Sequence, residues 1–165
     1  MHQLKLSGLH LVVMMYLVIN STQLIAQQCR SSVPESTPTS RFIVHGNGTV
    51  TDNKTGLMWK QCIERFSGHN CTDGFPMEMR WRDAMQHANT TVYAGYDDWR
   101  LPNFKELESI VEYQCTEPAL NTAIFHVSTR KLWTSSIKFL SPNGSLLSGL
   151  SPGFPLYFLL VRDGQ

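Results

Sequence analysis

The longest apolar run of the chain lies near its N-terminus and is followed by polar and small residues. Lys5 precedes residues 6–19, which are almost wholly apolar, and residues 20–26 lead to Ala26. A basic start, an apolar stretch and a small residue at the cut are typical of a secretory signal peptide, so we expect cleavage after Ala26. The alternative is an uncleaved anchor, but a run of about 14 residues is shorter than the roughly 20 that span a bilayer.

The next segment, residues 27–40, is rich in Ser, Thr and Pro. It has too few apolar positions to form a core of its own. We therefore expect a leader that would be free but for a disulfide at Cys29.

Short β-branched and aromatic runs, separated by turn residues, predict three strands at 41–45, 49–51 and 57–60. Asn47-Gly48 favours a two-residue type I′ hairpin turn, because both residues tolerate positive φ. Polar residues at 52–56 favour a second turn rather than a calcium loop, since the glutamate and the ligand spacing of such a loop are missing.

Two later stretches show helical spacing. One helix is predicted over residues 81–88, with an apolar face at i, i+3, i+4 and i+7 formed by Trp81, Ala84, Met85 and Ala88. The second is predicted over residues 104–113, because Asn103 is a good N-cap and Glu106 can complete a capping box. Further apolar runs predict strands at 132–136, 137–140, 145–150 and 157–162, which completes a small α+β domain over 41–165.

Charge adds little to this picture. Removal of residues 1–26 takes away Lys5 and no acidic residue, which leaves 13 basic and 13 acidic residues. A neutral balance gives no general attraction to nucleic acid or anionic lipid. We therefore expect no nucleic-acid partner, and after signal cleavage no run is long enough to cross a membrane.

The cysteines indicate an oxidising compartment. All four follow the predicted cleavage site, and an even count in an exported chain indicates two disulfides with three possible pairings. We favour Cys62–Cys71, which closes a short loop, and Cys29–Cys115, which would tie the N-terminus to the body. Separations of 33, 9 and 44 residues lack the paired spacing of a zinc site, so no metal is expected.

Seven segments resemble, in the same order, the Lcl C-terminal domain family, a bacterial family named after the terminal domain of a Legionella collagen-like protein. The most distinctive is DWRLPNFKEL at residues 98–107. The segments are 41–42 with 48–52, 55–59 with Cys62, 81–84, 97–107, Cys115 with 118–121 and Phe125, 133–136, and 160–165. Each is weak alone, but seven in register cover nearly all of 29–165.

The resemblance implies a C-type-lectin-like α+β fold, with two helices packed on small, twisted antiparallel sheets and stapled by the disulfides. Residues 99–107 are also similar to a helix-start motif of formylglycine-generating-type domains, which share this broad fold. The chain departs from the family after Trp133, where the sequence is shorter and residues 151–155 replace an aromatic-rich stretch. A family binding surface in that region would be altered here.

Five residues are candidates for binding: Arg80, Trp81, Arg82, Asp98 and Arg100. The two arginines that flank Trp81 could share a face and hold an acidic or sulfated glycan, against the alternative of an ordinary solvated surface. Arg100 could also hold a ligand, but a structural ion pair with Asp97 or Asp98 is the favoured interpretation.

No HExxH, GxSxG or phosphate-loop motif is present, so we expect neither an enzyme nor a cofactor. The sequence predicts an exported binding or structural module, periplasmic, secreted or on the cell surface. Its expected partner is an extracellular glycan, a surface polymer or an envelope protein. The alternative is an enzyme or metal-dependent factor that uses Asp97, Asp98 and Glu106 as acid, base or ligand.

Overall fold

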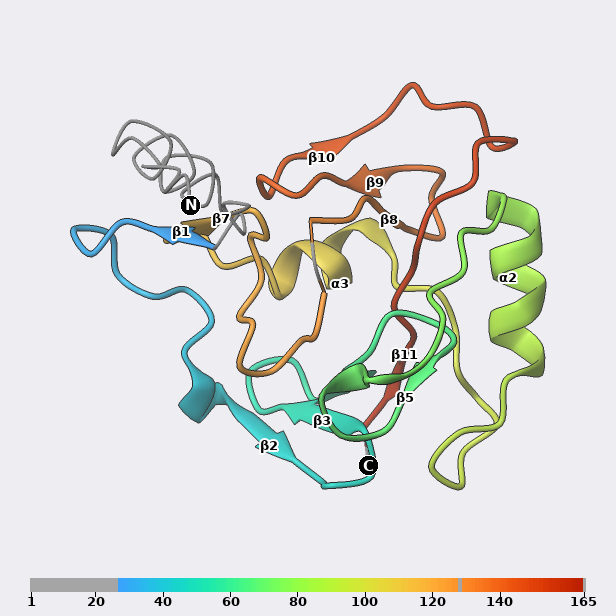
Figure 1. The fold of residues 1–165 in the computed structure, drawn as a ribbon, viewed down its shortest axis with the longest axis horizontal. Helices are drawn as coiled ribbons and strands as arrows, with labels where there is room; N and C mark the ends of the chain where they lie inside the picture. Colours follow the sequence, from blue (N-terminus) through green and yellow to red (C-terminus); the bar gives the residue numbers. More distant parts are fainter. Residues whose placement is uncertain (1–26, 128, 165) are drawn as a thin grey trace, which may run out of the picture.

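The structure is a computed structural model that describes residues 27–127 and 129–164. The predicted signal peptide and its cleavage site lie outside the described residues. Within them, the chain forms a small α+β fold with two α-helices, several short antiparallel sheets and long connecting loops (Figure 1). No helix in the described part is long and apolar enough to cross a membrane.

A four-stranded antiparallel sheet lies at the base of the molecule in the order β11-β4-β3-β2. Its strands are β2 (Phe42–Val44), β3 (Thr49–Asp52), β4 (Leu57–Lys60) and β11 (Val161–Asp163). The three strands predicted at 41–60 are thereby confirmed. The C-terminal strand pairs with β4, with Val161 opposite Trp59, so the two ends of the domain are joined in one sheet.

The remaining sheets are small. One is a meander of β8 (Leu132–Trp133), β9 (Phe139–Leu140) and β10 (Leu146–Leu147), and two are the pairs β5 (Phe66–Ser67) with β6 (Asp73–Gly74) and β1 (Gln28–Cys29) with β7 (Cys115–Thr116). The strand predicted at 157–162 is wrong over most of its length. Residues 158–160 are fully buried. The carbonyls of Phe158 and Leu160 accept isolated hydrogen bonds from the backbone N–H groups of Glu64 and Lys60, and these bonds do not form a strand ladder.

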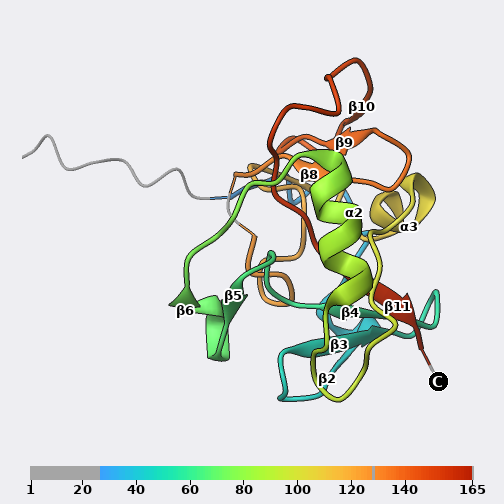
Figure 2. The ribbon, with the colours of Figure 1, turned by 90° about the vertical axis from the view of Figure 1, so that its right-hand side faces the viewer.

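Both predicted helices form, with different ends. Helix α2 (Trp81–Thr90) buries Ala84 and Ala88. In Figure 2 it runs from the β8–β10 meander down to the four-stranded sheet. Helix α3 (Phe104–Ser109) begins with the expected capping box of Asn103 and Glu106. It ends four residues earlier than predicted. In the turn that follows, the backbone N–H of Glu112 donates to the carbonyl of Ala119 instead of continuing the helix.

The first hairpin turn is not a two-residue type I′ turn. Gly46 and Gly48 have positive φ, whereas Asn47 does not, and the N–H of His45 donates to the carbonyl of Thr49. The loop therefore has three residues. The Asn47 carboxamide oxygen accepts from both the N–H and the hydroxyl of Thr49, which holds the loop closed.

The core consists of two apolar clusters. The first packs Trp59 and Phe42 edge-on against Phe125 between the four-stranded sheet and α3. The second gathers Trp99 and Trp133 under α2. All three tryptophans are 0–1 % exposed, so the large rings fill the space between elements too short to pack by themselves.

The disulfides Cys29–Cys115 and Cys62–Cys71 form in the structure, and no cysteine in the described residues is free. The first joins β1 to β7. The second closes the short loop that carries β5 and β6.

The leader is held by more than Cys29. The buried carboxylate of Glu112 accepts five hydrogen bonds, from the N–H and hydroxyl groups of Ser36 and Thr37 and from the N–H of Gln114. Burial raises the pKa of Glu112, but these donors outweigh it and lower the pKa from 4.5 to about 2. The disulfide at Cys29 holds the leader as expected, but Glu112 is a second attachment that the sequence does not indicate.

We expect Glu112→Gln to destabilise the fold at neutral pH and to flatten its acid unfolding profile. A carboxyl whose pKa falls from 4.5 to about 2 on folding stabilises the native state above pH 4.5 by about 3 kcal/mol, and this stability is lost as the pH falls toward 2. Denaturant unfolding at several pH values measures both effects. Glu35→Gln, in the same leader but exposed, is the matched control; equal losses in the two variants would contradict the assignment.

Candidate functional site

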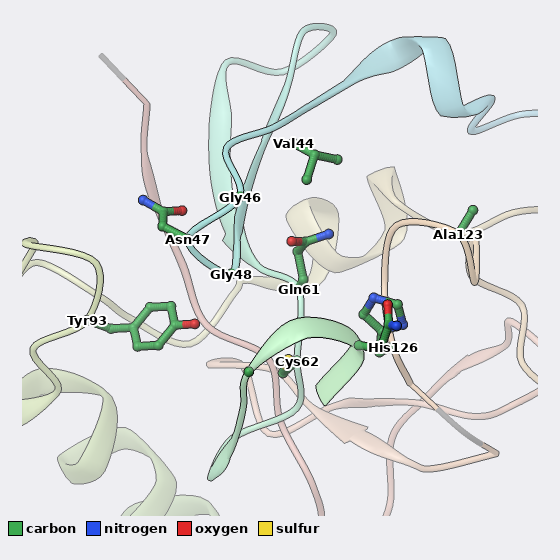
Figure 3. A pocket seen from close by; sticks show the side chains of 11 residues that line it. Val44, Gly46, Asn47, Gly48, Gln61, Cys62, Tyr93, Ala123 and His126 are labelled. Atoms are coloured by element: carbon green, nitrogen blue, oxygen red, sulfur yellow. The ribbon is translucent and has the colours of Figure 1, made fainter. Parts of the chain in front are cut away.

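A cavity of about 290 Å³ opens beside the β2–β3 turn. Its walls come from that turn, from the loop closed by Cys62–Cys71, from the segment around Ala123, and from the loop that follows α2 (Figure 3). It is lined by Val44, Gly46, Asn47, Gly48, Gln61, Cys62, Gly68, Asn70, Tyr93, Ala123 and His126. None of these is Asp, Glu, Lys or Arg, so the lining carries no carboxylate, ammonium or guanidinium group.

The polar side chains that line the cavity come from different elements, and Asn47 points away from the others (Figure 3). In Figure 3 the Tyr93 hydroxyl is directed toward Gly48, and the Gln61 carboxamide stands between the turn and Val44. Gln61 donates from Nε2 to the carbonyl of Ile124 at 3.0 Å, which fixes the orientation of its amide. Its Oε1 is thereby left as an acceptor on the cavity side.

Two glycines make room for this arrangement. Gly48 has φ +83°, and a Cβ on it would lie 1.9 Å from the Tyr93 hydroxyl oxygen. Gly46 has φ +72°, and a Cβ there would meet nothing within 4 Å. Both positions have a left-handed backbone, which favours glycine. Only at Gly48 does the absence of a side chain also make room for Tyr93.

Tyr93 is held from behind by Trp99. The two rings pack edge to face at 6.2 Å, and the indole Nε1 of Trp99 donates to the Tyr93 carbonyl at 3.1 Å. The backbones of Tyr93 and Tyr96 exchange hydrogen bonds of 2.9 and 3.0 Å. These contacts fix the backbone and the ring of Tyr93 in the loop after α2.

The five residues singled out by the sequence do not gather in this cavity. Arg80 and Arg82 are exposed at the start of α2, but Trp81 packs against the second core cluster and donates from Nε1 to the carbonyl of Thr134 at 2.9 Å. The ring of Trp81 is therefore used for packing between the two arginines.

Asp98 pairs with Arg162, which corrects the predicted pairing with Arg100. The two side chains form a bidentate contact of 2.6 and 3.0 Å, and the Arg162 guanidinium carbon lies 3.9 Å from the centre of the Tyr96 ring. Arg162 is only 4 % exposed. Its hydrogen bonds lower the pKa of Asp98, and Asp98 in turn raises the pKa of Arg162.

Arg100 instead binds Glu106 at 2.7 and 2.8 Å and Asp163 at 2.9 Å. Glu106 also accepts from the N–H of Asn103, so it is fully used in the capping box. The alternative site of Asp97, Asp98 and Glu106 therefore has its carboxylates on different partners. Among the described residues no group of three or more His, Cys, Asp or Glu side chains could hold a metal ion.

Sequence reasoning missed Gln61, Tyr93 and His126 as cavity residues. They lie far apart in the chain and carry no spacing motif. The one available signal was the Gly46-Asn47-Gly48 run, whose glycines permit a close approach but do not name the side chain that approaches.

Comparison with protein families identifies one match: the family model described as the Lcl C-terminal domain covers residues 48–155. No curated protein and no solved structure matches the chain.

We expect Gly48→Ala to be more disruptive than Gly46→Ala. Each substitution places a side chain on a left-handed backbone, at a cost of about 1 kcal/mol, but only Gly48→Ala also displaces the Tyr93 hydroxyl. Thermal unfolding should show the larger loss for Gly48→Ala, and near-ultraviolet circular dichroism should show a changed aromatic signal in that variant alone. Matching spectra and stabilities would show that the contact is unimportant.

Asp98→Asn should lower the free energy of unfolding by about 1–2 kcal/mol, because Arg162 stays buried without an anionic partner. The estimate is below that of a fully buried pair, since the Asp98 side chain is 53 % exposed. Asp97→Asn, at the exposed neighbour, should change stability by less than about 0.5 kcal/mol. Urea unfolding at neutral pH compares the two, and a greater loss in the Asp97 variant would refute the assignment.

Proposed function

Because the chain belongs to the Lcl C-terminal domain family, matched over residues 48–155, we propose that it is an exported, non-catalytic binding module with a C-type-lectin-like fold. The compartment is periplasmic, secreted or at the cell surface. Two disulfides and a complete absence of free cysteines in the described part favour an oxidising compartment. The proposed partner is a carbohydrate or a surface polymer.

The observation that carries this proposal is the cavity of about 290 Å³, whose polar lining contains no Asp, Glu, Lys or Arg. It lies near the lower end of the range for small-molecule sites, which is roughly 300–1,000 Å³. Amide, phenol and imidazole groups donate and accept hydrogen bonds, as sugar hydroxyls require. Val44 and Ala123 add small apolar surfaces that suit the C–H faces of a sugar ring.

The arrangement of the acidic residues favours a binding role over the enzymatic alternative. Asp98 is engaged by Arg162, and Glu106 by Arg100 and the α3 cap, so neither is available as an acid or base facing the cavity. Asp97 is exposed beside them and does not line the cavity.

A glycan array tests the proposal directly. The oxidised chain, applied at high micromolar concentration to neutral and sulfated glycans, should retain at least one of them. The matched control is Cys62→Ser/Cys71→Ser, which opens the cavity wall, keeps the Cys29–Cys115 bridge and should abolish retention. Failure of the oxidised chain to retain any glycan, or equal retention by both forms, would count against a cavity-based binding module.

A further inference from the structure

A buried ion pair lies next to Tyr93, one of the residues that line the cavity. Lys60, at the end of β4, donates from Nζ to both carboxylate oxygens of Glu64 at 3.0 and 2.9 Å. The two residues are only 3 % and 6 % exposed. Removing both charges from water costs much of what their attraction returns, so such a pair contributes little net stability.

The pair bears on the tyrosine of the cavity. The Nζ of Lys60 lies 4.2 Å from the centre of the Tyr93 ring, in position for a cation–π contact. Trp99 meets the same ring edge-on, at 6.2 Å. The phenol ring therefore contacts both a cation and an indole, and its hydroxyl is directed toward Gly48 at the cavity wall (Figure 3).

The buried ion pair balances its own charge, and the cavity lining contains no Asp, Glu, Lys or Arg side chain. Glu64 neutralises Lys60, and it also accepts from the N–H of Arg65 and lies 3.5 Å from Nε2 of His87. Burial raises the pKa of Tyr93, and the negative charge of Glu64 raises it further. Tyr93 thus presents a neutral hydroxyl, which can donate a hydrogen bond.

We propose that the cavity binds one uncharged sugar residue, with the Tyr93 hydroxyl as donor and Gln61 Oε1 as acceptor, and that Lys60 and Glu64 are the residues that position Tyr93. This inference rests on the proposed binding function and narrows its ligand class. An anionic or sulfated sugar would have to leave water for a lining that offers no Lys or Arg, which costs more than neutral hydrogen bonds return. The exposed Arg80 and Arg82 lie outside this cavity and take no part.

The ligand class is tested by calorimetric or NMR titration of the oxidised chain. The probes are galactose, mannose and N-acetylglucosamine as neutral sugars, and glucuronic acid and heparin as anionic ones. We expect a neutral probe to bind. Tyr93→Phe should lower the affinity for that probe roughly fivefold to tenfold, the effect of losing one hydrogen bond. The double variant Arg80→Ala/Arg82→Ala is the control and should bind as the unmodified chain does.

The positioning role is tested without a ligand. The ultraviolet absorbance of tyrosinate, with Tyr93 assigned by difference from Tyr93→Phe, should show Tyr93 ionising at lower pH in Glu64→Gln, since the anion that opposes ionisation is gone. A glutamate whose charge does not act on the Tyr93 hydroxyl would leave this titration unchanged. If Glu64→Gln fails to fold, the double variant Lys60→Met/Glu64→Leu replaces both charges by apolar groups. It should still lower the affinity for the neutral probe.

The outcomes separate the two proposals. Binding of anionic probes alone, or full affinity in Tyr93→Phe, overturns this inference while the chain remains a binding module. No binding to any probe or array glycan overturns the proposed function and this inference with it. An unchanged Tyr93 titration in folded Glu64→Gln overturns the positioning role alone.

Discussion

Buried carboxylates hold this fold together where helices and strands are too short to do so. Most of the described chain is loop, and a loop leaves backbone N–H groups that need acceptors once they are buried. Glu112 serves the leader in this way, and Asp52, which is 0 % exposed, accepts from Arg41, from the N–H of Lys54 and from the Thr55 hydroxyl. Hydrogen bonds from these donors lower the pKa of Asp52 despite its burial, as they do for Glu112.

Local chemistry could be predicted from the sequence, and long-range pairing could not. The capping box of α3 depends on Asn103 and Glu106, three residues apart, and it forms as expected. The partner of Asp98 is Arg162, which lies 64 residues away, and a nearer arginine made the wrong pairing attractive. The apolar run at 157–162 correctly indicated burial, but burial alone does not distinguish a ladder strand from a covered loop.

The cavity was beyond prediction for the same reason. Its lining joins a hairpin turn, a disulfide loop and two irregular segments, and each contributes one or two ordinary polar side chains. The candidates chosen from the sequence were conspicuous because they combined charge with tryptophan. In the structure those combinations serve packing and ion pairing, as with Trp81 on Thr134 and Arg100 on Glu106. The residues that face open space are the inconspicuous ones.

The Cys62–Cys71 bridge links the cavity wall to the redox state of the chain. It closes the nine-residue separation that carries Gly68 and Asn70, which form one side of the cavity, whereas the Cys29–Cys115 bridge fastens the leader at another place. In a newly made chain whose thiols are still reduced, the apolar core can form, but no disulfide closes the loop that makes this side of the cavity. Under the proposed function, formation of this bridge would complete the binding site, so glycan recognition would follow oxidation of the two thiols.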